Sequence, residues 1–224
     1  MTRKKLLHFD EMKDWPNVFE PEWDKDSGLA GTWGAHDGEA SGAGSRSVIL
    51  ELGCGRGHYT IALAQRDSDA TFVGVDIKGA RMWHGAGKAL ESGLANAKFL
   101  RTKIEDLGQH FAPGEVDEIW VTFPDPHPRE GSEKRRLTSS RFLEIYKKLL
   151  KPGGKLHLKT DDTPFFEWAL AVLQERGVEP EILIRDVHAE GGEQKVPEIL
   201  HVKTQYEEEF LAKGRKIKYL CAVI

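Results

Sequence analysis

Three glycines at alternating positions, between an apolar run and a helix-like pattern, constrain the fold of this chain more than any other feature. The run 48–52 has the composition of a short buried strand. Gly53, Gly55 and Gly57 follow it directly, and because glycine has no Cβ atom, such a loop can approach a ligand closely. Strand, glycine loop and helix together are typical of nucleotide-binding α/β folds. A dinucleotide fingerprint needs glycine at the sixth position of G-x-G-x-x-G, where this chain has His58, so the spacing disfavours a nicotinamide-dependent oxidoreductase.

Apolar runs and helix-like patterns alternate along the rest of the chain. The sequence predicts strands near 48–52, 71–76, 97–101, 117–123, 154–160, 180–186 and 217–223. It predicts helices near 58–66, 79–92, 138–150 and 163–176. Such alternation favours an α/β fold of the Rossmann-like, doubly wound type, with a mainly parallel sheet covered by helices on both faces. In sheets of this kind, ligands bind at the carboxyl ends of the strands.

Three carboxylates follow predicted strands and therefore fall at this same edge. Asp76 ends a strand about 20 residues past the glycine loop, where an acid can accept the hydroxyls of a ribose. The alternative is that Asp76 caps the next helix, since Asp is a favourable N-cap residue. Asp125 and Asp161 follow two later strands. We favour ribose binding for Asp76 and a single site that includes all three acids.

A proline-rich loop carries the second of these acids. In the run Phe123 to Pro128, two prolines bracket Asp125, and proline fixes φ, so the loop is stiff and can hold the carboxylate still. Lys134, Arg135 and Arg136 follow closely and supply a local trap for anions. The simpler alternative is a proline-rich turn followed by a solvated run of charge.

The distribution of charge favours a polyanionic partner, although the net charge of the chain is −4. Between Arg129 and Lys159 there are ten basic and three acidic residues, so this stretch carries +7 and the remainder −11. A basic face on an acidic body can bind nucleic acid. We assign Lys147, Lys148 and Lys151 to the solvated side of a helix, and the three consecutive cations beside the proline-rich loop to binding.

Several classes of protein are disfavoured by what the sequence contains. No segment approaches the roughly 20 apolar residues of a membrane span, and no apolar stretch of a signal peptide follows the first five residues. The two cysteines, Cys54 and Cys221, show no metal-binding spacing and do not suggest a disulfide framework. We therefore expect a cytoplasmic protein without a membrane segment or a bound metal.

The chain divides into three parts by composition. Residues 1–26 mix basic, aromatic and proline residues, and we expect an arm that packs on or near the site. Residues 27–47 are rich in Gly, Ala and Ser, which predicts a flexible segment that buries little and is dispensable for chemistry. Residues 48–224 hold the α/β pattern.

Seven motifs in this order are together specific to one family. They are Glu51 to Gly57, Asp76, Phe123 to His127 with Arg129, Lys134-Arg135-Arg136, Gly153-Gly154, Thr160-Asp161 and Thr204-Gln205-Tyr206-Glu207. With these motifs the chain resembles the bacterial tRNA (guanine-N7-)-methyltransferases, which modify guanine 46 in the variable loop of tRNA. The resemblance implies a class I methyltransferase fold with an antiparallel last strand, S-adenosyl-L-methionine as methyl donor, tRNA as partner, and a monomer or homodimer.

The resemblance also implies roles for particular residues. It places the donor on Glu51, Asp76 and Asp125, and the guanosine pocket on Arg129, Asp161 and the motif that contains Thr204, Tyr206 and Glu207. We add Gly53, Gly55 and Gly57 to the donor site because their backbone can approach a ligand. The backbone of Lys103 and Ile104 is our choice for the adenine contact. Lys134, Arg135 and Arg136 are assigned to tRNA, and Asp125 is the candidate catalytic residue.

The chain departs from the family pattern in the loop after Asp125. His127 stands where the family has Trp, Arg129 where it has Lys, and the segment 130–132 lacks two basic residues. Lys103-Ile104-Glu105 stands where many members have an Asp-Ala pair. These departures leave open a catalytically weakened relative that only binds RNA. Methyltransferases acting on another RNA, a small molecule or a protein are further alternatives.

The chemistry expected of such a site is an in-line displacement. N7 of neutral guanine has a free lone pair exposed in the major groove, so no proton must leave before attack. The methylated ring is cationic, and a nearby carboxylate such as Asp125 would lower the barrier electrostatically. Asp161 can accept from guanine N1–H and the exocyclic amine, which would distinguish guanine from adenine.

Overall fold

The predicted alternation of strands and helices is present in the computed structural model, which describes residues 3–22, 27–35, 45–189 and 196–224. The strands are β1 (Val18–Phe19), β2 (Ser47–Leu52), β3 (Ala70–Val75), β4 (Ala97–Leu100), β5 (Val116–Thr122), β6 (Leu150–Thr160), β7 (Ile182–Ile184) and β8 (Lys218–Val223). The α-helices are α1 (Arg3–Met12), α2 (His58–Arg66), α3 (Gly79–Glu91), α4 (Ser140–Leu149), α5 (Thr163–Glu175) and α6 (Gln205–Ala212). Three short 3₁₀ helices are η1 (Ile104–Gln109), η2 (Glu133–Arg135) and η3 (Glu198–His201). No helix in the described parts of the chain is long and apolar enough to cross a membrane.

All seven predicted strands and all four predicted helices are found, with shifts of a few residues. The largest shift is in β6, which begins at Leu150 because this residue already pairs with Val116 of β5. The register then shifts, so that Glu118 pairs with Lys155. The sequence did not predict α1, β1, α6 or the 3₁₀ helices.

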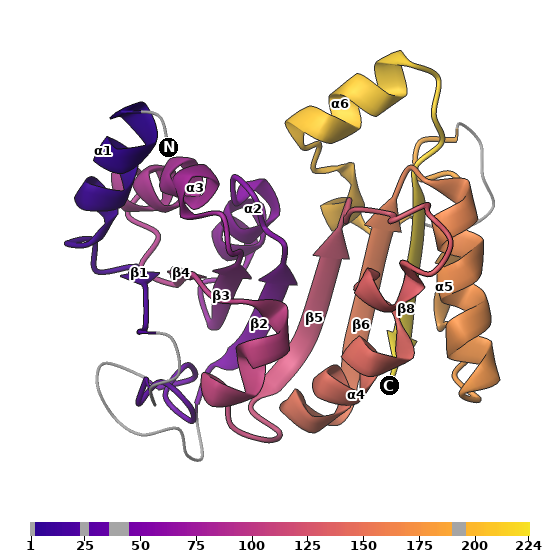
Figure 1. The fold of residues 1–224 in the computed structure, drawn as a ribbon, viewed down its shortest axis with the longest axis horizontal. Helices are drawn as coiled ribbons and strands as arrows, with labels where there is room; N and C mark the ends of the chain where they lie inside the picture. The colour runs from indigo at the N-terminus through magenta and orange to yellow at the C-terminus, as the bar shows by residue number, and fades with distance from the viewer. Residues whose placement is uncertain (1–2, 23–26, 36–44, 190–195) are drawn as a thin grey trace.

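The strands form one sheet in the order β1-β4-β3-β2-β5-β6-β8-β7. Neighbouring strands from β1 to β6 are parallel, and β8 runs antiparallel to both β6 and β7 (Figure 1). The prediction of a mainly parallel sheet with an antiparallel last strand is confirmed. The chain reverses its direction of winding at β2, from which β3 and β5 lie on opposite sides. A switch point of this kind opens a crevice at the carboxyl ends of the strands.

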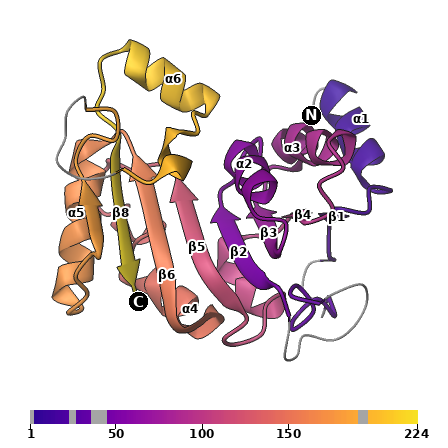
Figure 2. The same ribbon diagram turned by 180° about the vertical axis from the view of Figure 1, so that it is seen from behind.

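Helices cover both faces of the sheet, as the views from front and back show (Figures 1 and 2). Helices α4 and α5 pack on one face through Phe142, Tyr146 and Phe166. Helices α2 and α3 pack on the other through Tyr59 and Met82. Along β2, alternate residues belong to the two faces, as the twofold period of a strand requires.

The described part of the N-terminal arm packs against the body of the protein. Helix α1 lies on α3, and Met12 is buried there with 1% of its surface exposed. Trp15 faces Gly87 of α3, where a Cβ atom would lie 3.0 Å from the indole ring. Strand β1 adds to the edge of the sheet beside β4. The arm thus extends both the helical layer and the sheet.

The prediction that 27–47 is a flexible segment that buries little is wrong for its first nine residues. Trp33 is 6% exposed, and its ring stacks on Phe111 with the centroids 5.2 Å apart. Its indole Nε1 donates to the carbonyl of His110 at 2.7 Å, and its backbone N donates to Glu115 at 3.0 Å. One aromatic residue therefore anchors a segment whose average composition predicts little burial. Residues 36–44 lie outside the described residues.

Replacing Trp33 with alanine should lower the melting temperature by roughly 5 °C or more, because a cavity replaces a large buried side chain. Trp33→Phe keeps the stacking on Phe111 and loses only the indole N–H, so it should cost less. Replacing 36–44 with a Gly/Ser linker of equal length should leave both melting temperature and turnover unchanged. Calorimetry of the three variants checks this, and an unchanged melting temperature in Trp33→Ala would contradict the anchoring role.

Candidate functional site

A cleft of about 710 Å³ opens at the carboxyl ends of the parallel strands. It is lined by the glycine loop after β2, by Asp76 after β3, by Ile104 of η1 and by the loop after β5. Asp161 after β6, and Thr204 and Tyr206 at the start of α6, close the other side. The edge predicted to hold the site therefore gathers residues far apart in the sequence. Helix α6 stands across this edge from α2 and α3 (Figure 1).

The glycine loop has a left-handed backbone at each of its glycines. Gly53 and Gly55, with φ of 71° and 56°, line the cleft. A side chain at either position would be strained, and at Gly53 a Cβ atom would meet nothing closer than Leu137 at 3.9 Å. These two glycines fit the prediction of close approach by a ligand.

Gly57 has a different role from the one predicted. It is buried and is not among the described residues that line the cleft. A Cβ atom here would lie 2.6 Å from the ring of Phe99 on β4. Gly57 therefore allows α2 to pack closely on the sheet, and its assignment to the donor site is corrected.

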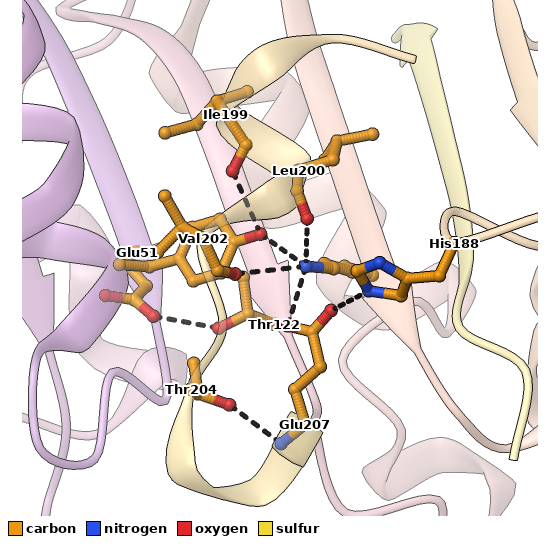
Figure 3. Close-up of polar contacts among 10 residues, drawn as sticks. Glu51, Thr122, His188, Ile199, Leu200, Val202, Thr204 and Glu207 are labelled. Atoms are coloured by element: carbon orange, nitrogen blue, oxygen red, sulfur yellow. Dashed lines mark hydrogen bonds and ion pairs between the residues drawn. The ribbon is translucent and has the colours of Figure 1, made fainter. Parts of the chain in front are cut away.

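Glu51 is a buried carboxyl group at the floor of the cleft. It is 3% exposed and accepts hydrogen bonds from the backbone N of Thr60 at 2.8 Å, from its hydroxyl at 2.5 Å, and from the hydroxyl of Thr122 at 2.8 Å. Figure 3 shows the contact with Thr122. Burial raises the pKa of Glu51 to about 7, against the hydrogen bonds from Thr60 and Thr122, which lower it. Near neutral pH this carboxyl is therefore poised between its two charge states.

Asp76 is 9% exposed and uses both carboxylate oxygens on nearby backbone. Oδ2 accepts from the N–H of Gly55 at 2.9 Å, and Oδ1 from that of Lys78 at 2.8 Å. The bond from Lys78 is the kind that the capping alternative requires, although Lys78 itself is the N-cap residue of α3. The acid ties the glycine loop to the end of β3 and lines the cleft there. Nearby, Ile104 also lines the cleft, whereas the exposed Lys103 is not among the described lining residues.

The loop that carries Asp125 is strained at both ends. Phe123 and His127, which flank the Pro-Asp-Pro run, have φ of 48° and 43° and are the two non-glycine residues with positive φ in the described chain. Such conformations cost on the order of 1–3 kcal/mol each and cluster at functional sites. Asp125 Oδ1 accepts from the backbone N of His127 at 3.0 Å, which closes a turn. The Asp125 side chain remains 71% exposed at the rim of the cleft.

Arg136 is half-buried and contacts this loop directly. Its guanidinium donates to the carbonyls of Pro126 at 3.0 Å and His127 at 3.2 Å. The same group lies over the ring of Trp168 at 4.5 Å. Arg136 therefore orders the loop around Asp125, and its assignment to tRNA stays a prediction.

The remaining cations of the cluster are free to bind a ligand. Lys134 and Arg135 are exposed, and neither has an ion-pair partner among the described residues. Arg135 lines the cleft, whereas Lys134 and Arg129 lie outside its described lining. Two exposed cations of the predicted anion trap thus stand after the strained loop, and the role of Arg129 in the guanosine pocket stays a prediction.

On the far side of the cleft, Asp161 is already paired. Its Oδ2 accepts from Arg215 Nη1 at 2.5 Å, and the Asp161 side chain is 9% exposed. The sequence analysis missed Arg215, because nothing in its surroundings in the sequence marks it as part of a site. Tyr206 is 45% exposed and Thr204 is buried, and both line the cleft.

Glu207 does not face the cleft, contrary to its assignment to the guanosine pocket. It is 0% exposed, and its two oxygens are bound by Lys159 at 2.7 Å and by His188 at 2.8 Å (Figure 3). A carboxylate held on both sides in the interior has no free face for a base. The family motif at 204–207 is thus divided between the cleft wall and the interior.

Comparison with known proteins gives consistent results. Residues 45–220 match a family model described as "Putative methyltransferase". The chain is 39% identical over 220 residues to a tRNA (guanine-N(7)-)-methyltransferase of Cytophaga hutchinsonii, covering 98% of this chain and 97% of that protein. It is 40% identical to a protein of the same name from Bacteroides thetaiotaomicron, covering 98% and 85% of the two chains. A third relative of that name, from Porphyromonas gingivalis, is 45% identical over 173 residues, covering 77% and 69%.

Solved structures show the same fold at lower identity. A 16S rRNA methyltransferase, KamB, superimposes with a TM-score of 0.60 at 19% identity, covering 81% of this chain and 89% of that one. A SAM-dependent methyltransferase from Aquifex aeolicus superimposes with a TM-score of 0.55 at 16% identity, covering 80% and 82%. The predicted class I methyltransferase fold is thereby confirmed.

Proposed function

The chain belongs to the tRNA (guanine-N7-)-methyltransferase family, and from this premise we propose that it transfers a methyl group from S-adenosyl-L-methionine to N7 of guanine 46 in the variable loop of tRNA. One observation carries the proposal beyond family membership. The strained loop with Asp125 lies at the rim of the same cleft as the glycine loop, Asp76 and Tyr206, although these segments are far apart in the sequence.

The half of the cleft next to β2 and β3 fits the methyl donor. The open backbone at Gly53 and Gly55 leaves room for it, and Asp76 at the end of β3 is placed to accept ribose hydroxyls. Glu51 supplies a buried carboxyl for the positive charge of the donor, and Ile104 offers an apolar contact for the adenine. These four contacts support the assignment of the donor to this half.

The other half of the cleft fits the guanosine and its flanking phosphates. Asp161 and Tyr206 lie opposite the donor half, and Arg135 stands beside the loop of Asp125. When bound, the donor supplies a methyl group on a sulfonium, and the N7–C bond forms as the C–S bond breaks. Positive charge moves to the guanine ring and no proton is released, so Asp125 acts by electrostatic stabilisation rather than as a base.

The intact loop argues against the alternative of a relative that only binds RNA. The sequence departs from the family pattern at His127 and at 130–132, yet the backbone N–H of His127 closes the turn on Asp125. Ser132 Oγ lies within hydrogen-bond distance of two carbonyls of the same loop, those of His127 and Arg129, and its one proton can be donated to either. The substituted residues thus support the carboxylate that the chemistry needs.

Methyl transfer to a defined tRNA tests the proposal. The protein should transfer labelled methyl groups to an unmodified tRNA transcript, and nuclease digestion should release 7-methylguanosine. A transcript with adenine at position 46 should accept none. Label in another nucleoside, or equal label in the adenine transcript, would contradict the proposed position.

Donor binding should strengthen about tenfold between pH 6 and pH 8, because a group with a pKa near 7 passes from about one-tenth to nine-tenths ionised over this range. Donor affinity rises with pH because the positively charged donor favours the carboxylate form of Glu51, which dominates at the higher pH. Titration calorimetry at several pH values measures the dissociation constant. Glu51→Gln should remove most of the pH dependence, and because the donor's own titration is the same in both proteins, it cancels in the comparison. If the dissociation constant of Glu51→Gln changed with pH as steeply as that of the wild type, the role of Glu51 would be refuted.

A further inference from the structure

Lys159 of β6 places a charged group in the interior behind the cleft. The residue is 0% exposed, and its Nζ, which has three N–H groups, lies within hydrogen-bond distance of four oxygens from α2, α6 and the residues 200–202. They are the carbonyl of Leu200 at 2.6 Å, Glu207 Oε2 at 2.7 Å, the hydroxyl of Tyr59 at 2.8 Å and the carbonyl of Val202 at 3.3 Å (Figure 3).

A buried ammonium group is costly unless it is paired and hydrogen-bonded. Burial lowers the pKa of Lys159 to about 8, and the charge of Glu207 opposes this shift. The group therefore remains mostly protonated at neutral pH. The rings of Tyr59 and Phe123 lie 5.1 and 5.8 Å from Nζ, which adds cation–π contacts. The surroundings of Lys159 are thus arranged to keep one positive charge in the interior.

The segment 198–212, which we call the C-terminal wall, is bonded to β6 through this charge, and Leu200 also packs in the apolar core beside it. Both carbonyls that Lys159 binds belong to η3 and the residues just after it, and Glu207 belongs to the first turn of α6. His188 holds the other oxygen of Glu207 at 2.8 Å. At the start of α6, Thr204 Oγ1 accepts from the backbone N of Glu207 at 3.1 Å, so fixing Glu207 also fixes Thr204.

The same residue supports the opposite wall of the cleft. The backbone carbonyl of Lys159 accepts from the N–H of Phe123 at 2.8 Å, where the strained loop of Asp125 begins. Phe123 also faces Phe210 of the C-terminal wall, with the ring centroids 5.9 Å apart. One residue of β6 therefore connects the loop that carries Asp125 with the wall that carries Thr204 and Tyr206.

We propose that Lys159 is a positioning residue that sets the C-terminal wall against the loop of Asp125, so that Thr204 and Tyr206 can receive the base without Lys159 touching it. The proposal deepens the proposed function and rests on it for the identity of the base. It also assigns Glu207 to this buried pair. The donor half of the cleft is built on β2 and β3, and Lys159 meets that side through the hydroxyl of Tyr59 on α2, so we expect the donor half to change little when the pair is removed.

Lys159→Met tests the proposal with a side chain of similar length and no charge. The KM for tRNA should rise or kcat fall so that kcat/KM drops at least tenfold, because small displacements of binding groups carry large kinetic costs. The dissociation constant for S-adenosyl-L-methionine should stay within about twofold of wild type. Hydrogen exchange should speed up in 198–212 and not in α3.

Lys151→Met is the matched control, since Lys151 lies on the same strand and also forms an ion pair, with Asp117 at 2.7 Å, at the end away from the cleft. It should change neither tRNA kinetics nor exchange in the C-terminal wall. The double variant Lys159→Met/Glu207→Gln removes both buried charges and should fold even where the single variant does not. It should still show the tRNA defect and the faster exchange.

Wild-type kcat/KM for tRNA in the folded double variant would overturn the proposal, and so would loss of donor affinity equal to the loss for tRNA. The two proposals fail in different ways. If the wild type forms no 7-methylguanosine, the proposed function fails, while hydrogen exchange of 198–212 still reports whether Lys159 orders the wall.

Discussion

Replacing Asp125 with alanine should lower the turnover number for tRNA methylation by about 10³-fold, because a preorganised charge near a developing cation contributes on this scale. The carboxylate is 71% exposed and lies outside the core, so the variant should keep its melting temperature within a few degrees. Single-turnover methyl transfer under saturating donor and tRNA isolates the chemical step. Donor binding should weaken much less than turnover.

Asp125→Asn is the sharper variant, since it retains an oxygen that can accept from the backbone N of His127 and loses only the charge. If the charge of Asp125 accelerates methyl transfer, Asp125→Asn and Asp125→Ala should lose turnover to a similar degree. If Asp125 acts only by holding the turn, the turnover number of Asp125→Asn should be close to that of the wild type. Near-wild-type turnover in both folded variants would remove Asp125 from the chemistry altogether.

Neutralising Lys134 and Arg135 together should weaken tRNA binding about 30-fold at low salt, on the order of 1 kcal/mol for each phosphate contact. With two phosphate contacts fewer, fewer counterions are released when tRNA binds. The slope of log affinity against log salt should therefore become shallower by about 1 to 2. Donor affinity should not change. Filter binding or fluorescence anisotropy at four or more salt concentrations measures both quantities.

Arg136 should behave differently from its two neighbours in the sequence. It holds the carbonyls of Pro126 and His127, so Arg136→Met should lower turnover by disordering the loop and leave the salt slope as it is. Lys147 and Lys148, two exposed cations of α4, serve as the control pair and should change neither quantity. A shallower salt dependence of tRNA binding in Arg136→Met would show that Arg136 contacts phosphate. An unchanged salt dependence after neutralising Lys134 and Arg135 would show that these two do not.

Most of the fold could be predicted because its core elements obey local rules. The runs that became β2, β3 and β5 are apolar and short, and helices α2 to α5 show helical periodicity with turn residues at their ends. Helix α6 was missed although a signal was present. Thr204 and Glu207 have the spacing of a capping box, and Thr204 does cap the helix. The same four residues form the last family motif, so the resemblance favours a binding role over a helix start at this position.

Burial by distant partners could not be predicted from composition. Trp33 is one aromatic residue in a stretch of Gly, Ala and Ser, and what orders it is Phe111 and Glu115, about 80 residues later. The same limit applies to Glu207 and Arg136. The family resemblance suggested a ligand contact for Glu207, and the charge cluster suggested one for Arg136. The partners that hold them, Lys159 and the carbonyls of the Asp125 loop, become neighbours only in the folded chain.

The site could be predicted where it depends on the ends of strands. Asp76, Asp125 and Asp161 all line the cleft because parallel strands deliver their carboxyl ends to one edge. Pairings across the cleft could not be predicted in this way. Arg215 comes from the turn before β8, and it reaches Asp161 only because β8 runs antiparallel beside β6.

The most direct test of the account uses a tRNA that carries 7-deazaguanosine at position 46. This base keeps the Watson–Crick edge of guanine and replaces the N7 lone pair with a C–H group. We expect the modified tRNA to bind with nearly the affinity of the unmodified one and to accept no methyl group, while the unmodified tRNA yields 7-methylguanosine. Methyl transfer to the 7-deazaguanosine tRNA at the wild-type rate would show that another atom is the target and would contradict the account.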